Sequence, residues 1–182
     1  MRTRDALASG IHPRTLYAMR DRGLLERVSR GVYRLSDADP LSDPDLLAIA
    51  ARVPTGVICL TSALAFHELT TQIPHEVDIA LPAGAWTPKI SYPPIRIYRF
   101  GGRSMTEGIE NWVEDGITIS VFSPEKTLAD CFKFRNKIGL DIATEALRMY
   151  RAQRKQNLPV VMRYAEVDRV ANVMRPYLEA TL

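Results

Sequence analysis

The sequence predicts an α+β protein in two parts: a small N-terminal module of two helices and a β-hairpin, and a larger α+β domain with an antiparallel sheet and C-terminal helices. Three observations predict it. Residues 1–34 hold eight arginines and three acids, so their net charge is +5, whereas the whole chain of 182 residues carries only +3. Residues 36–42 are rich in Ser, Asp and Pro, as linkers are. Helical and strand-like patterns both follow this linker. We therefore expect domains at residues 1–36 and 43–182.

The composition indicates a folded protein that stays in the cytoplasm. Hydrophobic residues make up 46% of the chain and charged residues 25%, which are ordinary values for a globular protein. No apolar run approaches the roughly 20 residues of a membrane-spanning helix, and no signal-type stretch follows the first residues. Cys59 and Cys131 lie far apart between apolar neighbours, which predicts reduced core thiols rather than a disulfide or a metal site. We expect no membrane partner, metal or cofactor.

Two short helices are expected first. Thr3 can cap a helix that ends at Ser9, before a glycine. Pro13 suits the first position of the second helix, because the N–H that proline lacks would be unsatisfied there, and this helix runs to Arg22.

A basic hairpin is expected next. Residues 24–28 and 31–35 are short extended runs, and a Ser-Arg-Gly turn separates them. Helix, tight turn, helix and hairpin is the order of elements in a winged helix-turn-helix, a module that binds double-stranded DNA. The concentrated positive charge fits a polyanionic partner.

The second domain is expected to begin with a helix at Pro44, capped by Asp43. A buried strand over residues 57–60 follows, and Ser62 can cap a helix over residues 63–69.

Four more strands are predicted. Two of them, residues 76–81 and 95–100, lie on either side of a long connection containing Pro and Gly. The other two, residues 109–114 and 117–122, flank Asp115-Gly116, which is a strong hairpin signal.

Helices are expected to complete the chain. Residues 123–125, Ser-Pro-Glu, are a typical helix start, and the helix should run to about residue 137. Asp141 can cap an amphipathic helix that ends near residue 156. The tail, residues 158–182, has a helical pattern with a break or kink expected near Pro176.

The candidate functional residues lie on the second helix and on the hairpin. A recognition helix reads base edges with its N-terminal residues, and nearby cations hold phosphates. Arg14 can bind guanine through two parallel hydrogen bonds from its guanidinium. The alternative is that Tyr17 belongs to the core and that Arg20 pairs with Asp21 or Glu26. The predicted DNA-binding residues are Arg14, Thr15, Tyr17, Arg20, Arg22, Arg27, Ser29 and Arg30.

The second domain also contains residue types that catalytic sites use. Glu68, Glu76 and Asp78 lie near His67 and His75, and a metal-dependent nuclease would need such carboxylates. The spacing does not match a zinc or nuclease motif, so ordinary surface and strand positions are the favoured interpretation. We expect no enzymatic activity.

Several segments in order along the chain resemble the AbiEi-type antitoxins of abortive-infection (type IV) toxin–antitoxin systems. The segments that carry this resemblance are residues 14–17, 25–34, 60–64, 73–82, 92–94, 123–132 and 174–178.

The resemblance implies a transcriptional autorepressor that binds operator DNA through its winged helix. It also implies a second domain that counteracts a cognate nucleotidyltransferase toxin, with or without direct contact. The first helix of the module is expected to be short or missing relative to the family. Two alternatives remain: a winged-helix regulator whose second domain senses a ligand, and the metal-dependent nuclease.

Overall fold

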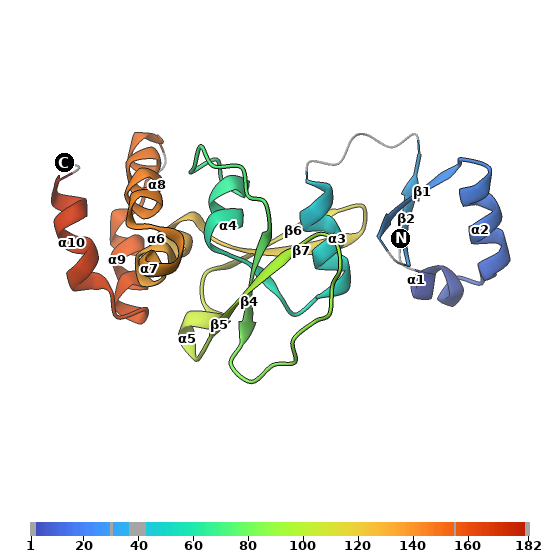
Figure 1. The fold of residues 1–182 in the computed structure, drawn as a ribbon, viewed down its shortest axis with the longest axis horizontal. Helices are drawn as coiled ribbons and strands as arrows, with labels where there is room; N and C mark the ends of the chain where they lie inside the picture. Colours follow the sequence, from blue (N-terminus) through green and yellow to red (C-terminus); the bar gives the residue numbers. More distant parts are fainter. Residues whose placement is uncertain (1–2, 30, 37–42, 155, 181–182) are drawn as a thin grey trace. The chain divides into compact units, whose positions relative to one another are not determined.

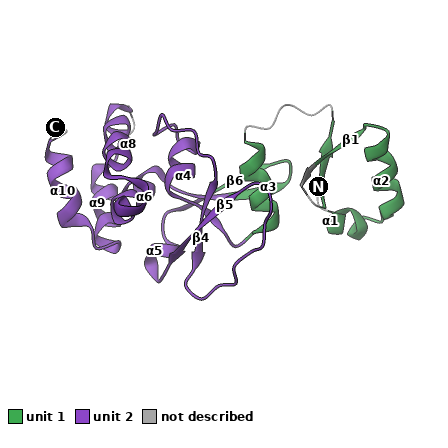
Figure 2. Cartoon of the chain, viewed as in Figure 1, with its two compact units in different colours: residues 1–54, 111–119 green, residues 55–110, 120–182 purple. Residues whose placement is uncertain are grey.

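The computed structural model describes residues 3–29, 31–36, 43–154 and 156–180 (Figure 1). The chain forms two compact units, one of residues 1–54 with 111–119 and the other of residues 55–110 with 120–182 (Figure 2). The predicted linker lies outside the described residues except for Ser36.

The N-terminal module has the predicted order of elements. Its helices and strands are α1 (Thr3–Ala8), α2 (Pro13–Asp21), β1 (Leu25–Ser29) and β2 (Val32–Leu35). The two strands pair antiparallel, with Leu25 opposite Leu35. Ala6, Leu16, Leu25 and Tyr33 form a small core between the helices and the hairpin.

The start of α1 differs from the prediction. Thr3 lies inside the helix rather than capping it. Its hydroxyl donates to the carbonyl of Gly31 over 3.1 Å, and its backbone N–H donates to the same oxygen over 2.8 Å. The side chain therefore ties α1 to the hairpin turn, a use that local sequence does not reveal.

Helix α2 has the predicted proline at its first position, and His12 caps it by accepting a hydrogen bond from the N–H of Arg14 over 3.2 Å. At the other end Gly23 has a positive φ of 74°. The N–H of Leu24 then donates to the carbonyl of Met19 over 3.0 Å, which satisfies one of the last free carbonyls of the helix.

The second part of the chain holds a five-stranded sheet in the order β5-β4-β3-β7-β6. Its strands are β3 (Val57–Ile58), β4 (Val77–Pro82), β5 (Ile95–Phe100), β6 (Ile109–Glu114) and β7 (Ile117–Phe122).

The α+β class is confirmed, but the sheet is mixed rather than purely antiparallel. β3 pairs antiparallel with β4, whereas β3 with β7 and β4 with β5 are parallel pairs. Parallel neighbours need a connection of a dozen residues or more, and residues 83–94 are long enough to make it. The predicted hairpin at Asp115 and Gly116 is present, with φ of 49° and 72° at these two residues.

The helices of the second part are α3 (Pro44–Arg52), α4 (Leu60–Phe66), α5 (Arg103–Thr106), α6 (Pro124–Lys133), α7 (Arg135–Ile138), α8 (Leu140–Ala152), α9 (Leu158–Val167) and α10 (Ala171–Ala180). The caps predicted at Asp43 and Ser123 are confirmed, since each side chain accepts a hydrogen bond from the first turn of its helix.

Several predicted helix boundaries in the second part of the chain are wrong, among them the end of α6, which lies at Lys133 rather than near residue 137. Ser62 lies inside α4, because its hydroxyl is used by the neighbouring β4: it accepts from the N–H of Asp78 over 2.8 Å. Asp141 lies in the first turn of α8, because Gly139, at a φ of 102°, already ends the preceding helix. The last break falls between α9 and α10, where Arg169 has a φ of 58°, and Pro176 lies inside α10.

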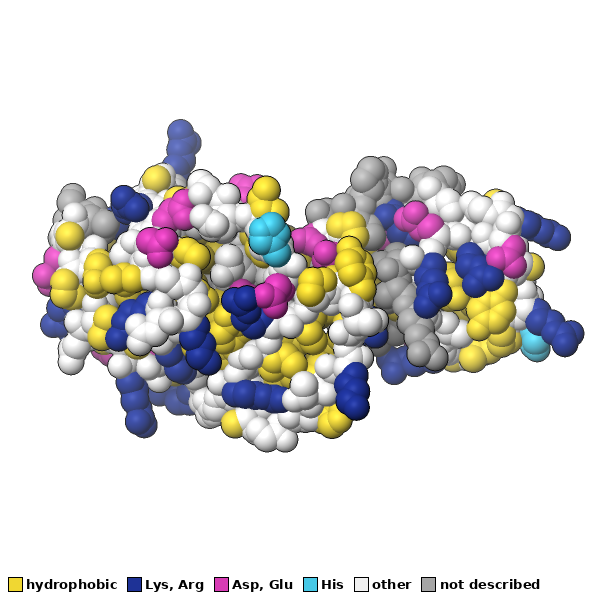
Figure 3. Space-filling model, in the orientation of Figure 1, with side chains coloured by type: hydrophobic (Ala, Val, Ile, Leu, Met, Phe, Trp, Pro, Cys, Tyr) yellow, Lys and Arg dark blue, Asp and Glu magenta, His cyan; other side chains and the backbone are white. Residues whose placement is uncertain are grey.

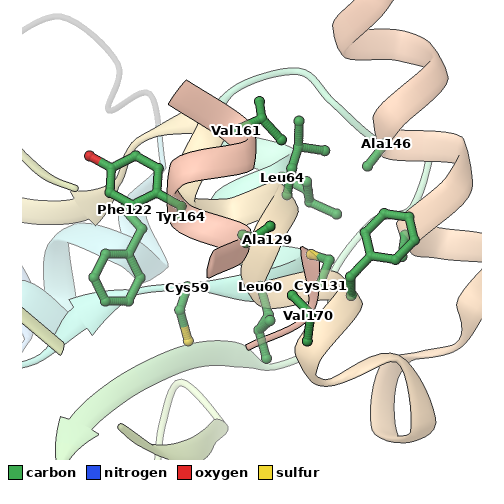
Figure 4. Close-up of a cluster of buried hydrophobic side chains, with 14 of the residues drawn as sticks. Cys59, Leu60, Leu64, Phe122, Ala129, Cys131, Ala146, Val161, Tyr164 and Val170 are labelled. Carbon is green, nitrogen blue, oxygen red and sulfur yellow. The ribbon is translucent and has the colours of Figure 1, made fainter. Parts of the chain in front are cut away.

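Helix α6 lies at the centre of the core of the second unit. It packs against α4, α8, α9 and α10, and the last three lie on the same side of the sheet as α6 in Figure 1. Buried apolar side chains from these helices and from the sheet meet around it (Figure 4). Cys59 and Cys131 are both buried and free, as predicted. Among the described residues, no helix is both long and apolar enough to cross a membrane.

Candidate nucleic-acid interface

Helix α2 carries four of the eight predicted DNA-binding residues: Arg14, Thr15, Tyr17 and Arg20. Leu16 is buried and faces the module core, whereas Arg14 and Thr15 in the first turn are exposed. Tyr17 is 44% exposed, so it is not a core residue. The amino end of α2 therefore presents a cation, a hydroxyl and an aromatic ring to solvent, which are groups that can contact base edges and phosphates.

Arg20 is held by its neighbours on α2. Its Nε and Nη2 atoms donate to the same carboxylate oxygen of Asp21 over 2.9 and 2.7 Å, and its Cζ lies 5.3 Å from the centre of the Tyr17 ring. The hydrogen bond and charge of Asp21 raise the pKa of Arg20. Of the two partners that the sequence offers Arg20, Asp21 and Glu26, the structure shows pairing with Asp21. Arg20 would have to share or exchange this partner to bind a phosphate.

The other predicted contacts lie on either side of the hairpin. Arg22 caps the carboxyl end of α2 and is exposed. Arg27 is exposed on β1, opposite Tyr33. At the wing tip, Ser29 ends β1 but its side chain is outside the described part of the structure, and Arg30 is outside it altogether.

The sequence did not predict the role of Arg34 in β2. Its side chain is buried, and Nε lies 3.3 Å from a carboxylate oxygen of Glu26 and 3.2 Å from one of Asp115. One of the eight N-terminal arginines is therefore an internal ion-pairing group, and we do not count it toward the DNA-facing charge. The only sequence signal was its place next to buried Val32 and Tyr33 on a short strand.

The acids of the nuclease alternative do not form a metal site. Glu76 pairs with Arg96, and Asp78 accepts a hydrogen bond from the N–H of Thr61 over 3.1 Å. Burial raises the pKa of Asp78 to about 6. Within the part of the chain that the structure describes, no group of three or more His, Cys, Asp or Glu side chains could hold a metal ion.

The second unit contains an ionic cluster that sequence reasoning missed, and we define it as Ser104, Lys126, Asp130, Lys133 and Asp168. Lys126 is fully buried; its Nζ donates to Asp130 and, over 3.1 Å, to Asp168. Lys133 reaches Asp168 over 3.0 Å and Ser104 over 2.9 Å, and the hydroxyl of Ser104 also donates to Asp168. The cluster therefore joins α5 and α6 to the turn between α9 and α10.

The pKa values of the two carboxyl groups in the cluster are shifted in opposite directions. Burial, reinforced by the charge of Asp168, raises the pKa of Asp130 well above its ordinary value. Burial would also raise the pKa of Asp168, but hydrogen bonds from its neighbours and the charges of Lys126 and Lys133 hold it below the ordinary value. Asp168 is thus the better stabilised anion of the pair.

Comparison with known families bears on the N-terminal module. Residues 2–36 match the family model described as "Transcriptional regulator, AbiEi antitoxin". The module is similar to the AbiEi antitoxins. The match covers α1, α2, β1 and β2, so the resemblance noted from the sequence is confirmed there. No curated protein is similar enough to the chain to count as a match.

Proposed function

We propose that this protein is a DNA-binding antitoxin that represses its own operon and counteracts a nucleotidyltransferase toxin. Residues 1–36 bind the operator as a winged helix-turn-helix, and residues 43–182 form the antitoxin domain. The observation that carries the proposal is the match of residues 2–36 to AbiEi antitoxin regulators, over a module whose second helix exposes Arg14 and Thr15.

In this proposal the amino end of α2 reads bases and the surrounding arginines bind the backbone. Arg14 and Thr15 lie in the first turn of α2, which is the part of a recognition helix that meets base edges in the major groove. Tyr17 and Arg20 form a stacked pair one turn further along. Arg22 and Arg27, together with Ser29 and Arg30 at the wing, supply phosphate contacts, which fix the register of the module without reading sequence.

Operator binding is tested with the full chain and the DNA upstream of its own gene, measured by fluorescence anisotropy against a scrambled duplex of equal length. Arg14→Ala should weaken binding by about 1–3 kcal/mol if this residue reads a base. Arg14→Lys should recover only part of the loss, because lysine keeps the charge but lacks the two-pronged geometry. Affinity should fall steeply as salt rises.

Arg175→Ala is the matched control, since Arg175 is an exposed arginine on α10, outside the N-terminal module. It should leave operator affinity unchanged. Unaltered operator binding by a variant with alanine at Arg14, Arg20 and Arg30 would rule out the proposed interface.

The antitoxin activity is tested by growth after co-expression with a candidate nucleotidyltransferase, first of all one encoded by an adjacent gene. The Arg14→Ala variant should lose repression of a promoter reporter but still rescue growth, because its second domain is intact. A chain that represses the reporter yet never rescues growth would instead support the alternative of a regulator with a sensing domain.

A further inference from the structure

A second surface of the chain has features of a nucleic-acid contact, apart from the winged module. It is the connection between β4 and β5, residues 83–94, which joins two adjacent parallel strands without a helix. Connections of this length without secondary structure are uncommon in small domains, and many of them carry function. We call it the 83–94 connection.

The 83–94 connection is fixed to the sheet at its first half. The N–H of Ala83 donates to the carbonyl of Phe100 over 2.8 Å. Arg99 on β5 donates from Nη2 to the hydroxyl of Thr87 over 2.7 Å and from Nη1 to the carbonyl of Pro82 over 3.3 Å. Side chains next to these anchors are therefore presented from a defined backbone position, which lowers the entropy lost when they bind a partner.

Two large aromatic side chains project from the 83–94 connection into solvent. Trp86, which directly precedes the anchored Thr87, is 73% exposed, and Tyr92 is 69% exposed. Burying such rings in the core would be favourable, so rings of this size held in water on one short connection indicate a surface that is covered by a partner.

The charged residues in the stretch of sequence that contains these rings are all basic. Residues 79–106 contain no Asp or Glu and four basic residues. Arg96 and Arg103 each pair with a glutamate from outside this stretch. Arg99 donates to two uncharged oxygens, which position its guanidinium without neutralising it, and Lys89 is exposed. Figure 3 shows basic and hydrophobic side chains next to one another over this lower part of the second unit.

We propose that the 83–94 connection binds single-stranded nucleic acid, with bases stacked on Trp86 and Tyr92 and phosphates held by Lys89 and Arg99. Exposed aromatic rings beside unneutralised cations are what proteins use for this ligand, because every unpaired base offers a face for stacking. A duplex fits less well, since its bases are already stacked on one another. A protein partner would gain from the rings but not from a stretch of 28 residues without an acid.

The test measures binding of fluorescein-labelled 12-nucleotide oligo(dT) and oligo(U) to the full chain, in parallel, by fluorescence anisotropy at low salt. The two arms show whether the strand is DNA or RNA. Trp86→Ala should weaken binding at least about fivefold, and adding Tyr92→Ala should weaken it further, because each ring contributes a stacking contact. Lys89→Ala should reduce the slope of affinity against salt. Circular dichroism verifies that each variant is folded.

Two matched controls separate this surface from others. Trp112→Ala removes an exposed tryptophan of β6, outside the 83–94 connection, and should leave oligonucleotide affinity unchanged. Arg14→Ala should also leave it unchanged while weakening operator binding, so this inference and the proposed operator function can fail separately. The inference is overturned if neither oligonucleotide binds, or if the folded Trp86→Ala, Tyr92→Ala double variant binds both as tightly as the original chain.

Discussion

Replacing Lys126 with methionine should destabilise the second unit strongly. Methionine keeps much of the side-chain volume in a fully buried site, but it removes the ammonium that donates to Asp130 and Asp168. Asp168 retains Lys133 and Ser104, whereas Asp130 loses the ammonium that donates to it and lies at the centre of an apolar core. Breaking a buried pair by removing one partner costs about 3–5 kcal/mol, because a charge or an unpaired polar group stays buried.

Urea unfolding followed by circular dichroism measures this cost. With a slope of about 1–3 kcal/mol per molar urea, the loss should move the midpoint by more than about 1 M. The double variant Lys126→Met, Asp130→Leu should recover much of the loss, because it replaces both charged partners with apolar groups. The difference between the double variant and the two single variants gives the coupling between the residues.

The exposed pair of Arg103 and Glu107 is the control, because it has the same spacing of four residues as Lys126 and Asp130. The Arg103 side chain is 71% exposed, against 0% for Lys126. Solvent screens such a pair, so Arg103→Ala should leave the midpoint unchanged. Equal shifts of the urea midpoint for Arg103→Ala and Lys126→Met, or no shift for either, would refute the argument that burial makes the contribution of the cluster to stability large.

Three further predictions concern the second unit. Burial raises the pKa of Asp78 to about 6, so the native state binds this proton more tightly than the unfolded state, and stability should fall by about 2 kcal/mol as pH rises from about 4 to 6; Asp78→Asn should flatten urea midpoints measured across that window. Gly108→Ala should lower the midpoint more than Gly84→Ala: both glycines have a positive φ, but a Cβ at Gly108 would lie 2.7 Å from the Cβ of Lys126, and one at Gly84 would meet nothing within 4 Å. Ser123→Ala removes the cap of α6 and should cost about 1 kcal/mol, whereas Ser123→Asp should retain most of the stability; an alanine variant as stable as the original would contradict the role of this cap.

Local signals in the sequence predicted much of the fold. Proline after a capping residue set the starts of α3 and α6, and glycine set the end of α2. The Asp115-Gly116 pair set the hairpin of β6 and β7. Each of these features depends on backbone geometry within a few residues, so a short stretch of sequence is enough to predict it.

Features that depend on distant partners were missed or misplaced. The hydroxyl of Ser62 looked like a helix cap, but it bonds to β4, 16 residues away. Arg34 looked like one more DNA-facing cation, but Glu26 and Asp115 neutralise it. The burial of Lys126 could not be predicted locally, because its partner Asp168 lies 42 residues further along the chain. At the candidate interface, Leu16 is the buried residue of α2, and Arg14 and Thr15 in the first turn are exposed.

The segment of residues 123–132 shows where the function of the second domain should be sought. The structure places most of it in the core: α6 buries seven consecutive residues, from Lys126 to Phe132. Residues so placed determine packing and are closed to a toxin, a nucleic acid or a ligand. The activity of the second domain must therefore come from its surface. The 83–94 connection, where we propose that single-stranded nucleic acid binds, exposes Trp86 and Tyr92 on that surface.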